Sequence, residues 1–326
     1  MHSTRREFLA MAGAATLLAA SPGAVRAQAK LDAVKIFVGF TPGTTPDVLA
    51  RKVAEKLTRG YAHSALVENR VGAGGQLAVT ATKASPGDGS GVLLTAMSIL
   101  GVYPYTYKKL PYDPVADLAP VSMGATFDYG IGVGPAVPES VKDVRDLMAW
   151  YRANPGSTSI GSPATGSTLH FAAVMLGKAA GLNLTHVGYK GSGPAIQDML
   201  GGTLPALCTP LGTLLNQPKL RVLGTSGARR SPFTPQAPTL LEQGFKDMVF
   251  SEWYGFYLPA TASPATVARL NAALREALAA QDVIETLTTF GMEAAPSSPE
   301  QLKTALREAQ ATWAPIVKAT GFTADS

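Results

Sequence analysis

Residues 34–57 read VKIFVGFTPGTTPDVLARKVAEKL, and this stretch indicates the fold class of the chain. Its first part, residues 34–40, is apolar and rich in β-branched side chains, which is typical of a buried strand. Thr45 then offers a hydroxyl as helix N-cap, and Pro46 suits the first helical position. Apolar residues recur at three- to four-residue spacing up to Leu57, as in an amphipathic helix. A strand, a Gly- and Thr-rich loop and a helix in this order predict an α/β unit.

The same alternation continues along the chain. We predict further strands at 64–68, 92–95, 157–160, 184–187 and 220–225, and further helices at 167–180 and 194–200. The last third reads as helical, because Ser263-Pro264 and Ser298-Pro299 each place a capping serine before a proline. The sequence therefore predicts two parallel-sheet units with a helical C-terminal part.

Composition excludes several classes of protein. The 326 residues are 46% hydrophobic, enough for two domains with large cores. With 1 Cys and 4 His, we expect neither a disulfide framework nor a metal site. The formal charge of +5 is scattered, so no nucleic acid partner is expected. Residues 72–74 read Gly-Ala-Gly but lack the third glycine of a dinucleotide motif, and we expect no cofactor.

The first residues have the pattern of an export signal. Thr4-Arg5-Arg6-Glu7-Phe8-Leu9 is a twin-arginine pattern, and the apolar run that follows, residues 10–20, is too short to span a bilayer. Small residues then suit a signal peptidase, with cleavage after Ala27 or Ala29. We predict a twin-arginine signal peptide over residues 1–27 and a periplasmic location. The choice between the Tat and Sec routes stays open.

Four loops are candidates for a ligand site. In parallel sheets, ligands bind beyond the carboxyl ends of the strands, and this rule selects residues 41–46, 69–76, 162–168 and 188–194. All four loops are rich in Gly, Ser and Thr. Two of them lead directly into helix N-termini, whose free N–H groups and dipole favour an anion.

Five motifs in these regions resemble one family. They are Phe40-Thr41-Pro42-Gly43 with Asp47 (F-x-P-G-G-x-x-D), residues 67–75 (V-E-N-R-P-G-A-G-G), residues 161–167 with His170 (G-x-G-S-x-x-H), residues 186–191 (H-V-P-Y-K-G) and residues 238–244 (P-T-L-x-E-x-G). In this order they resemble the tripartite tricarboxylate transporter receptors, the periplasmic Bug proteins. The resemblance covers essentially the whole chain after the signal peptide.

The resemblance implies a type II periplasmic binding protein, with two α/β lobes joined by two crossover segments. Lobe 1 would comprise residues 30–124 plus 255–326, and lobe 2 residues 125–254. The crossover segments would lie near residues 119–128 and 251–259 and form a hinge. Lobe 1 would therefore be discontinuous in sequence, because the helical C-terminus returns to it.

The resemblance also implies a function. Such a receptor captures a small organic carboxylate between the lobes, through backbone N–H and hydroxyl groups, and delivers it to a membrane permease. The expected ligand-binding residues are Phe40, Thr41, Gly43, Thr44, Thr45, Gly74, Ser98, Ser162, Thr165, Gly166, Ser167, Thr168, Tyr189 and Thr209. We expect a monomer with no catalytic residue and no metal. A sensor without a transport role would use the same fold, so that alternative stays open.

The chain departs from the family pattern at the expected cleft. Thr44 stands where the family usually has a second glycine, and Thr209 where many members have an aspartate. Pro205 replaces an earlier aspartate, and residues 210–221 are several residues shorter than usual. Without the aspartate, we expect poor recognition of ligands that carry an ammonium or amide nitrogen opposite the carboxylate.

Individual residues have competing interpretations. Ser167 or Ser192 with His170 or His186 would suit an exported serine hydrolase, but no acidic partner is evident and no nucleophile-elbow motif is present. We therefore interpret His170 as a buried structural histidine. Asp47 is interpreted as stabilising its own helix start. Tyr189 fits a cleft wall or loop packing equally well. Trp253, Tyr254 and Phe256 are interpreted as hinge packing in preference to a stacking surface for an aromatic ligand.

Overall fold

The first sheet unit is built from the stretch that opens with β1 (Leu31–Val38). The structure is a computed structural model that describes residues 29–215 and 217–324. After β1 come α2 (Thr45–Gly60), β2 (Ala62–Asn69), α3 (Gln76–Lys83) and β3 (Gly91–Ala96). β1 pairs in parallel with both β2 and β3, which confirms the predicted α/β unit. Its inward side chains, Val34, Ile36 and Val38, have no exposed surface.

The start of α2 differs from the prediction. The N-cap is Thr44, not Thr45, and no side chain caps the helix. The Thr44 hydroxyl instead donates to the carbonyl of Thr41 at 2.7 Å, and the Thr45 hydroxyl bonds the Tyr254 hydroxyl at 2.7 Å. Thr44 thus bonds within its own loop and Thr45 bonds to a distant segment, so neither hydroxyl caps the helix.

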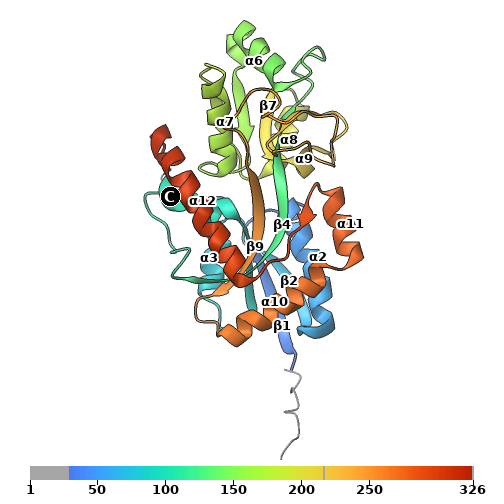
Figure 1. Cartoon of the computed structure of the whole chain (residues 1–326), viewed down its shortest axis with the longest axis vertical. Coiled ribbons are helices and arrows are strands. Elements are labelled where there is room, and N and C mark those ends of the chain that lie inside the picture. The colour runs from blue at the N-terminus through green and yellow to red at the C-terminus, as the bar shows by residue number, and fades with distance from the viewer. Residues whose placement is uncertain (1–28, 216, 325–326) are drawn as a thin grey trace, which may run out of the picture. The chain divides into compact units, whose positions relative to one another are not determined.

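Two long strands connect the two halves of the sheet. β4 (Leu118–Val133) and β9 (Ser251–Pro259) run antiparallel side by side, with register from Leu118 opposite Pro259 to Asp128 opposite Ser251. They contain the segments predicted as crossovers, and Figure 1 shows both passing from the lower to the upper half of the molecule. The end of β4 pairs with β7 (Ala206–Pro210) and β8 (Arg221–Thr225).

The second half repeats the parallel pattern. β5 (Ser159–Ser162) lies between β6 (Thr185–Gly188) and β7, parallel to both. Around this sheet lie α6 (Val144–Ala153), α7 (Thr168–Ala179), α8 (Ser192–Leu200) and α9 (Leu211–Leu215). The strand β7 was not predicted from the sequence. Its five residues are all buried, and a short apolar run without alternation gives no periodic signal.

Residues 264–320 are largely helical, as predicted, apart from the two-residue β10 (Glu293–Ala294). The strands β8, predicted at 220–225, and β9 also lie in the last third of the chain, so the prediction of a helical last third was wrong for its first part. The helical part contains α10 (Pro264–Leu278), α11 (Gln281–Thr289) and α12 (Pro299–Thr320). The side chains of Ser263 and Ser298 cap α10 and α12 as predicted. α10 and α11 pack against α2, and α12 packs against β4 and the short helices α4 (Met97–Gly101) and α5 (Tyr103–Thr106).

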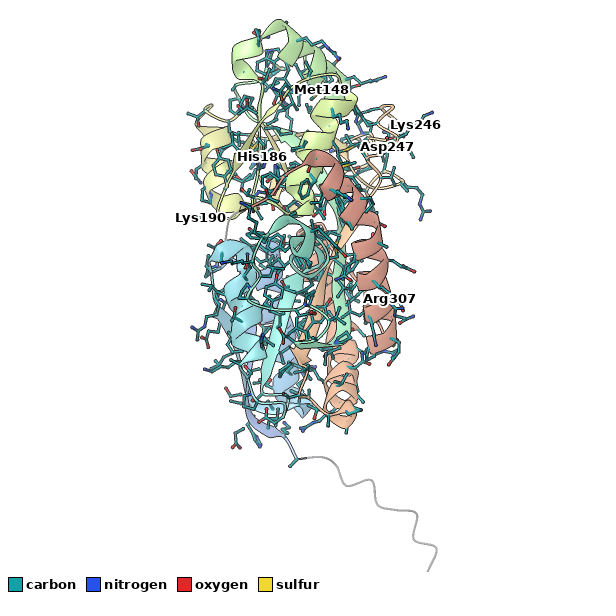
Figure 2. All side chains as sticks on the ribbon, turned by 90° about the vertical axis from the view of Figure 1, so that its left-hand side faces the viewer. Met148, His186, Lys190, Lys246, Asp247 and Arg307 are labelled. Carbon is teal, nitrogen blue, oxygen red and sulfur yellow. The ribbon has the colours of Figure 1, made fainter. Side chains whose placement is uncertain are left out.

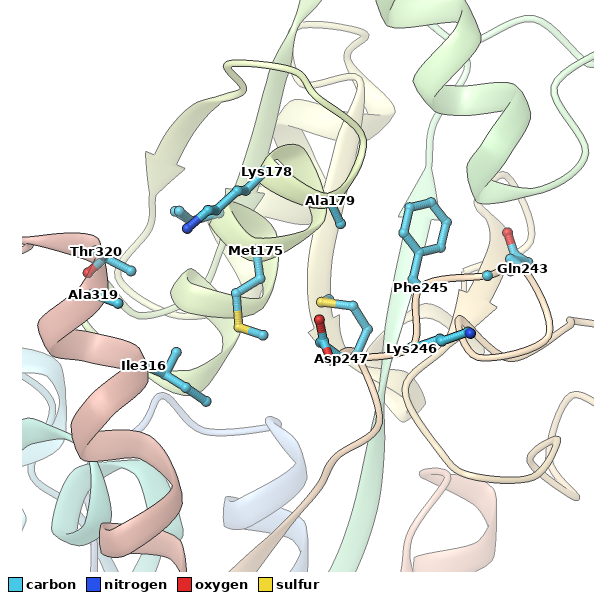
Figure 3. Close-up of a pocket in the computed structure, with 13 residues that line it drawn as sticks. Met175, Lys178, Ala179, Gln243, Phe245, Lys246, Asp247, Ile316, Ala319 and Thr320 are labelled. Atoms are coloured by element: carbon cyan, nitrogen blue, oxygen red, sulfur yellow. The ribbon is translucent and has the colours of Figure 1, made fainter.

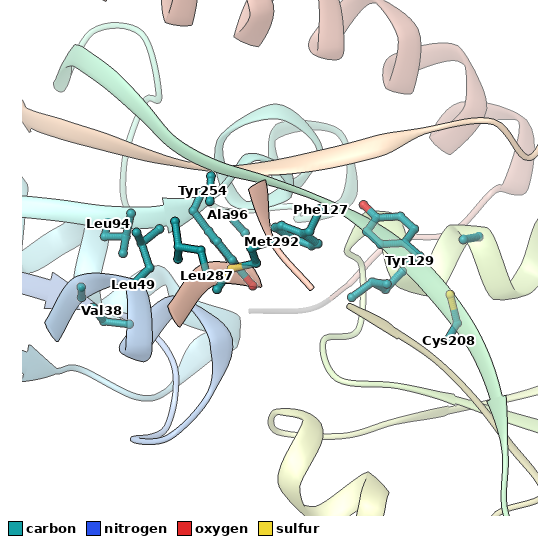
Figure 4. Packing of buried hydrophobic residues seen from close by; sticks show 14 of the residues in the cluster. Val38, Leu49, Leu94, Ala96, Phe127, Tyr129, Cys208, Tyr254, Leu287 and Met292 are labelled. Atoms are coloured by element: carbon teal, nitrogen blue, oxygen red, sulfur yellow. The ribbon is translucent and has the colours of Figure 1, made fainter. Parts of the chain in front are cut away.

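One hydrophobic cluster continues from the first half into the second. Figure 4 shows it passing from Leu49 and Leu94, past the stacked rings of Phe127 and Tyr254, to Tyr129 and Cys208. The Phe127 and Tyr254 ring centroids lie 4.6 Å apart. Cys208 is fully buried, as expected of an inert thiol. The two halves therefore share a core along the connecting strands, within one compact unit that begins at Leu31.

The predicted signal peptide lies outside the described residues. None of the helices described in residues 29–324 has the length and apolar character needed to cross a bilayer.

Candidate functional site

The carboxyl ends of the strands in both halves face a common cleft. Its narrow centre, about 50 Å³, has walls from both sheet units. The first unit contributes Thr44, Thr45 and Ser98, which follow β1 and β3. The second unit contributes Ala164 and Ser192, which follow β5 and β6. This placement matches the rule for ligand sites in α/β sheets.

Two wider cavities share residues with this centre. One, about 320 Å³, is lined by the Gly-rich loop 71–75 and by residues 163–165 and 188–191. The other, about 310 Å³, lies between residues 41–45 and the start of α8. Lys190 lines the first of them, and Figure 2 shows it at the boundary between the two halves. We refer to the narrow centre and these two cavities together as the cleft.

A buried carboxylate fixes the loop on the first wall. Asp47 accepts hydrogen bonds from the backbone N–H of Gly43 at 2.9 Å, from Asn69 at 2.8 Å and from two guanidinium nitrogens of Arg51. Burial alone would raise the pKa of Asp47, but the bonds from Arg51, Gly43 and Asn69 outweigh it and hold the pKa below its ordinary value. Asp47 is therefore structural, as predicted, and its bonds extend beyond its own helix.

The second Gly-rich loop has an unusual backbone. Ala73, Gly74 and Gly75 all have positive φ, at 46°, 63° and 99°. This left-handed course lets Gly75 approach Gly39 closely, so that a Cβ on Gly39 would lie 2.6 Å from the Gly75 Cα. Both loops of the first wall therefore depend on glycine for their course.

On the second wall, a buried histidine holds the loop before α7. His170 is 4% exposed, and its Nδ1 accepts the backbone N–H of Gly166 at 3.1 Å. Burial lowers the pKa of His170 to about 4, so the ring is neutral at pH 7. The Ser167 hydroxyl donates to the Ala164 carbonyl at 2.6 Å. These contacts confirm the structural interpretation of His170.

An acidic side chain, Glu252 on β9, lies at the centre of the cleft. One of its oxygens accepts the backbone N–H of Ser98 at 2.9 Å. The other accepts the hydroxyl of Thr168 at 2.6 Å and the hydroxyl of Tyr129. Burial and the Glu252 charge raise the pKa of Tyr129 far above neutrality, so this phenol keeps its proton and donates it. Glu252 thus joins β9 to α4, to α7 and to β4.

Most of the residues predicted to bind ligand line the cleft. They are Phe40, Thr41, Gly43, Thr44, Thr45, Gly74, Ser98, Thr165, Ser167 and Tyr189. Four others line none of its cavities, namely Ser162, Gly166, Thr168 and Thr209. Of these four, Thr209 is fully buried with its hydroxyl 3.2 Å from that of Ser192, and Thr168 is bonded to Glu252. Tyr189 both lines the cleft and packs under its loop, with its hydroxyl bonded to Asp198 at 2.7 Å.

Several residues of the cleft were not predicted from the sequence. The narrow centre is also lined by Glu252, Ala164 and Thr213, and by Ser192, which was considered only as a hydrolase nucleophile. Tyr254, interpreted as hinge packing, does stack on Phe127 but also lines the cleft. Glu252 could have been identified from the sequence, because it is the one acidic residue in the apolar strand SEWYGFYLP. Burying a charged side chain in such a strand is energetically unfavourable, so its presence there indicates a structural or functional role.

The serine–histidine pairs proposed for a hydrolase do not form. Ser167 bonds a backbone carbonyl and Ser192 lies beside Thr209. The structure does pair Ser162 with His186 at 2.8 Å, but Ser162 has no exposed surface. Burial and the adjacent His170 lower the pKa of His186 to about 3, which makes it a weak base at neutral pH. No group of His, Cys, Asp or Glu side chains within residues 29–324 is placed to hold a metal ion.

A larger groove of about 870 Å³ lies elsewhere (Figure 3). Met175 and Lys178 line it from the C-terminal end of α7, together with Phe245, Lys246 and Ile316. The cleft, in contrast, meets α7 at its N-terminal end, at Ser167 and Leu169. Figure 2 shows Lys246 and Asp247 on the opposite side of the molecule from Lys190. We do not assign the ligand site to this groove, because no loop at a strand's carboxyl end in the parallel units lines it.

Known proteins resemble this chain over most of its length. The family model described as "Tripartite tricarboxylate transporter family receptor" matches residues 49–322. Protein BugT of Bordetella pertussis is 30% identical over 318 residues, which cover 96% of this chain and 95% of BugT. The solved structure of R. palustris Rpa4515 with adipate has a TM-score of 0.84 at 28% identity, over 90% of this chain and 98% of that one. The periplasmic binding protein BugD has a TM-score of 0.82 at 26% identity, with the same coverage.

Proposed function

Because this chain belongs to the tripartite tricarboxylate transporter receptor family, we propose that it is an exported receptor that captures a small organic carboxylate in the cleft. Members of the family are periplasmic solute-binding proteins, and the fold is that of a periplasmic binding protein. The adipate in the R. palustris relative supports a carboxylate as the class of ligand.

One observation carries the proposal: a single cavity has walls from both halves of the sheet. Thr44 and Ser98 face it from the first half, and Ala164 and Ser192 from the second. A ligand held there touches both halves, so it stabilises the arrangement in which they are close together. Such closure is the signal that a permease or a sensor can recognise.

The donors available to an anion are hydroxyls and helix N-termini. The N–H groups of Gly43 and Gly166 are bonded to Asp47 and His170, so they are not free for ligand in this arrangement. α2 and α7 both begin at the cleft, and the first N–H groups of a helix have no partner within it. Together with the Ser192 hydroxyl, they favour a carboxylate without a fixed cationic partner.

The remaining parts of the proposal concern the protein in the cell. We propose export by the predicted N-terminal signal, a monomeric receptor, and delivery to a tripartite tricarboxylate-type permease. The proposed lobes are residues 30–124 plus 255–326 and residues 125–254, which place the change of lobe within β4 and β9.

Native mass spectrometry of the protein purified without refolding tests the proposal. We expect a retained organic acid of low mass that is released on denaturation and that raises the Tm when added back to stripped protein. Turnover of ester substrates that is lost in a Ser162→Ala variant, with no stabilisation by any carboxylate, would contradict a receptor and favour a hydrolase.

A further inference from the structure

Glu252 places a negative charge in the cleft without a cation to balance it. Its three hydrogen-bond partners, Ser98, Thr168 and Tyr129, are all neutral donors. No lysine, arginine or histidine in the described part of the chain forms an ion pair with it. A buried carboxylate in this setting repels a second carboxylate strongly, because little water screens the two charges.

We propose that Glu252 determines ligand preference: the cleft selects a carboxylate whose other end carries an ammonium or amide nitrogen, and it discriminates against dicarboxylates. The inference rests on the proposed function, because it assumes that the cleft holds a carboxylate ligand. Beyond that function, the inference specifies the second functional group of the ligand and the residue that binds this group.

Glu252 retains capacity for one more hydrogen bond. Each carboxylate oxygen accepts about two bonds. Oε2 accepts two, from Thr168 and Tyr129, whereas Oε1 accepts one, from Ser98. Glu252 and Ser98 both line the narrow centre of the cleft. A nitrogen donor that reaches the centre can therefore fill the remaining position on Oε1.

The charges along the cleft also give the ligand a direction. Lys190 is exposed and lines the wider cavity, whereas Glu252 is 2% exposed at the narrow centre. A ligand with charges at both ends is most stable with its carboxylate toward the Gly-rich loops and Lys190, and its nitrogen toward Glu252. A dicarboxylate of the same length would instead place its second charge against Glu252.

This inference reverses the expectation based on Thr209. The absence of an aspartate at that position predicted poor recognition of nitrogen-bearing ligands. Thr209 is fully buried and lines none of the cavities, so its side chain does not itself face a ligand in the cleft. Glu252 supplies a carboxylate from a different strand, β9.

The test compares ligands of equal length that differ only in the second group. Calorimetric titrations would use succinate against 3-aminopropanoate, glutarate against 4-aminobutanoate, and adipate against 5-aminopentanoate. For the length that fits, we expect the wild type to bind the amino acid at least about tenfold more tightly than the diacid. In Glu252→Gln, which keeps the shape and removes the charge, we expect that ratio to fall at least about tenfold. Glu308→Gln, which removes an exposed charge on α12, is the matched control and should keep the wild-type ratio.

The outcomes separate the two proposals. A wild type that binds diacids as tightly as amino acids, or more tightly, overturns the inference and leaves the receptor function intact. A folded Glu252→Gln protein with the wild-type ratio also overturns it. If Glu252→Gln fails to fold, the inference is decided by the ratio of amino-acid to diacid affinity in the wild type alone. Binding of neither class of ligand contradicts the proposed function itself, and the inference with it.

Discussion

Gly39 and Gly75 lie backbone against backbone, just after the end of β1, where both residues line the cleft. A Cβ on Gly39 would lie 2.6 Å from the Gly75 Cα and 2.8 Å from its carbonyl oxygen. Backbone atoms cannot move aside as a flexible side chain can. This contact therefore fixes how closely the two loops of the first wall approach each other.

Gly39→Ala should separate these loops. We expect the free energy of unfolding to fall by about 1–3 kcal/mol, because the added methyl group must push the backbone apart. Ligand affinity should fall as well, since both loops line the cleft. Urea unfolding and calorimetry measure the two effects. Gly60→Ala is the control, because a Cβ there meets nothing within 4 Å, and its stability should not decrease. A Gly39→Ala protein as stable as wild type would contradict the close contact.

Asp47→Asn should loosen the loop that precedes α2. The substitution removes the charge that holds Arg51 and one acceptor for Gly43 or Asn69. We expect a loss of about 1–3 kcal/mol, the cost of leaving buried donors without a partner. The pKa of Asp47 is lowered on folding, so its contribution is present above pH 4 and is lost as the pH falls through the folded pKa. Urea unfolding at pH 7 and pH 3 should therefore show a larger difference between wild type and variant at pH 7 than at pH 3.

The adjacent, partly or fully buried rings of His170 and His186 should make the protein sensitive to mild acid. Their ring centroids lie 3.9 Å apart, and burial lowers their pKa values to about 4 and about 3. Between these values and the ordinary pKa of 6.5, the unfolded chain binds more protons than the folded one, so stability falls as the pH falls. We expect the free energy of unfolding to be about 1–4 kcal/mol lower at pH 5 than at pH 7.

A histidine variant tests whether the buried pair causes this dependence of the free energy of unfolding on pH. His186→Gln should reduce the dependence on pH between 7 and 5, while the exposed His63→Gln should leave it unchanged. Equal slopes in wild type and His186→Gln would show that the buried pair does not carry the effect.

The regular parts of the fold could be predicted because periodic patterns identify them. The strands at 64–68 and 92–95 and the serine caps of α10 and α12 were predicted from local signals, and the structure confirms them. β7 was missed because a short, fully buried strand has no alternation. The cap of α2 was assigned one residue too late, because Thr44 and Thr45 have equal local preference and only the tertiary contact with Tyr254 distinguishes them.

The cleft was predictable only in part. Loops that follow parallel strands must meet at one edge, so residues such as Thr44 and Ser167 could be selected from the sequence. Which of their groups face the cavity depends on contacts between distant segments. Gly43 and Gly166 have their N–H groups bonded to Asp47 and His170, and Glu252 reaches the centre from a strand more than a hundred residues away. No local pattern contains those pairings.

The most direct test of a cleft with two walls crowds it from each side in turn. Thr44→Phe fills it from the first half and Ser192→Phe from the second, with Ala311→Phe on the exposed face of α12 as the control. Each protein would be titrated by calorimetry with the acid that the wild type retains, after its Tm shows that it is folded. We expect both cleft variants to lose affinity by at least about 100-fold, while the control binds as the wild type does. Wild-type affinity in either folded cleft variant would contradict a ligand held between the two halves.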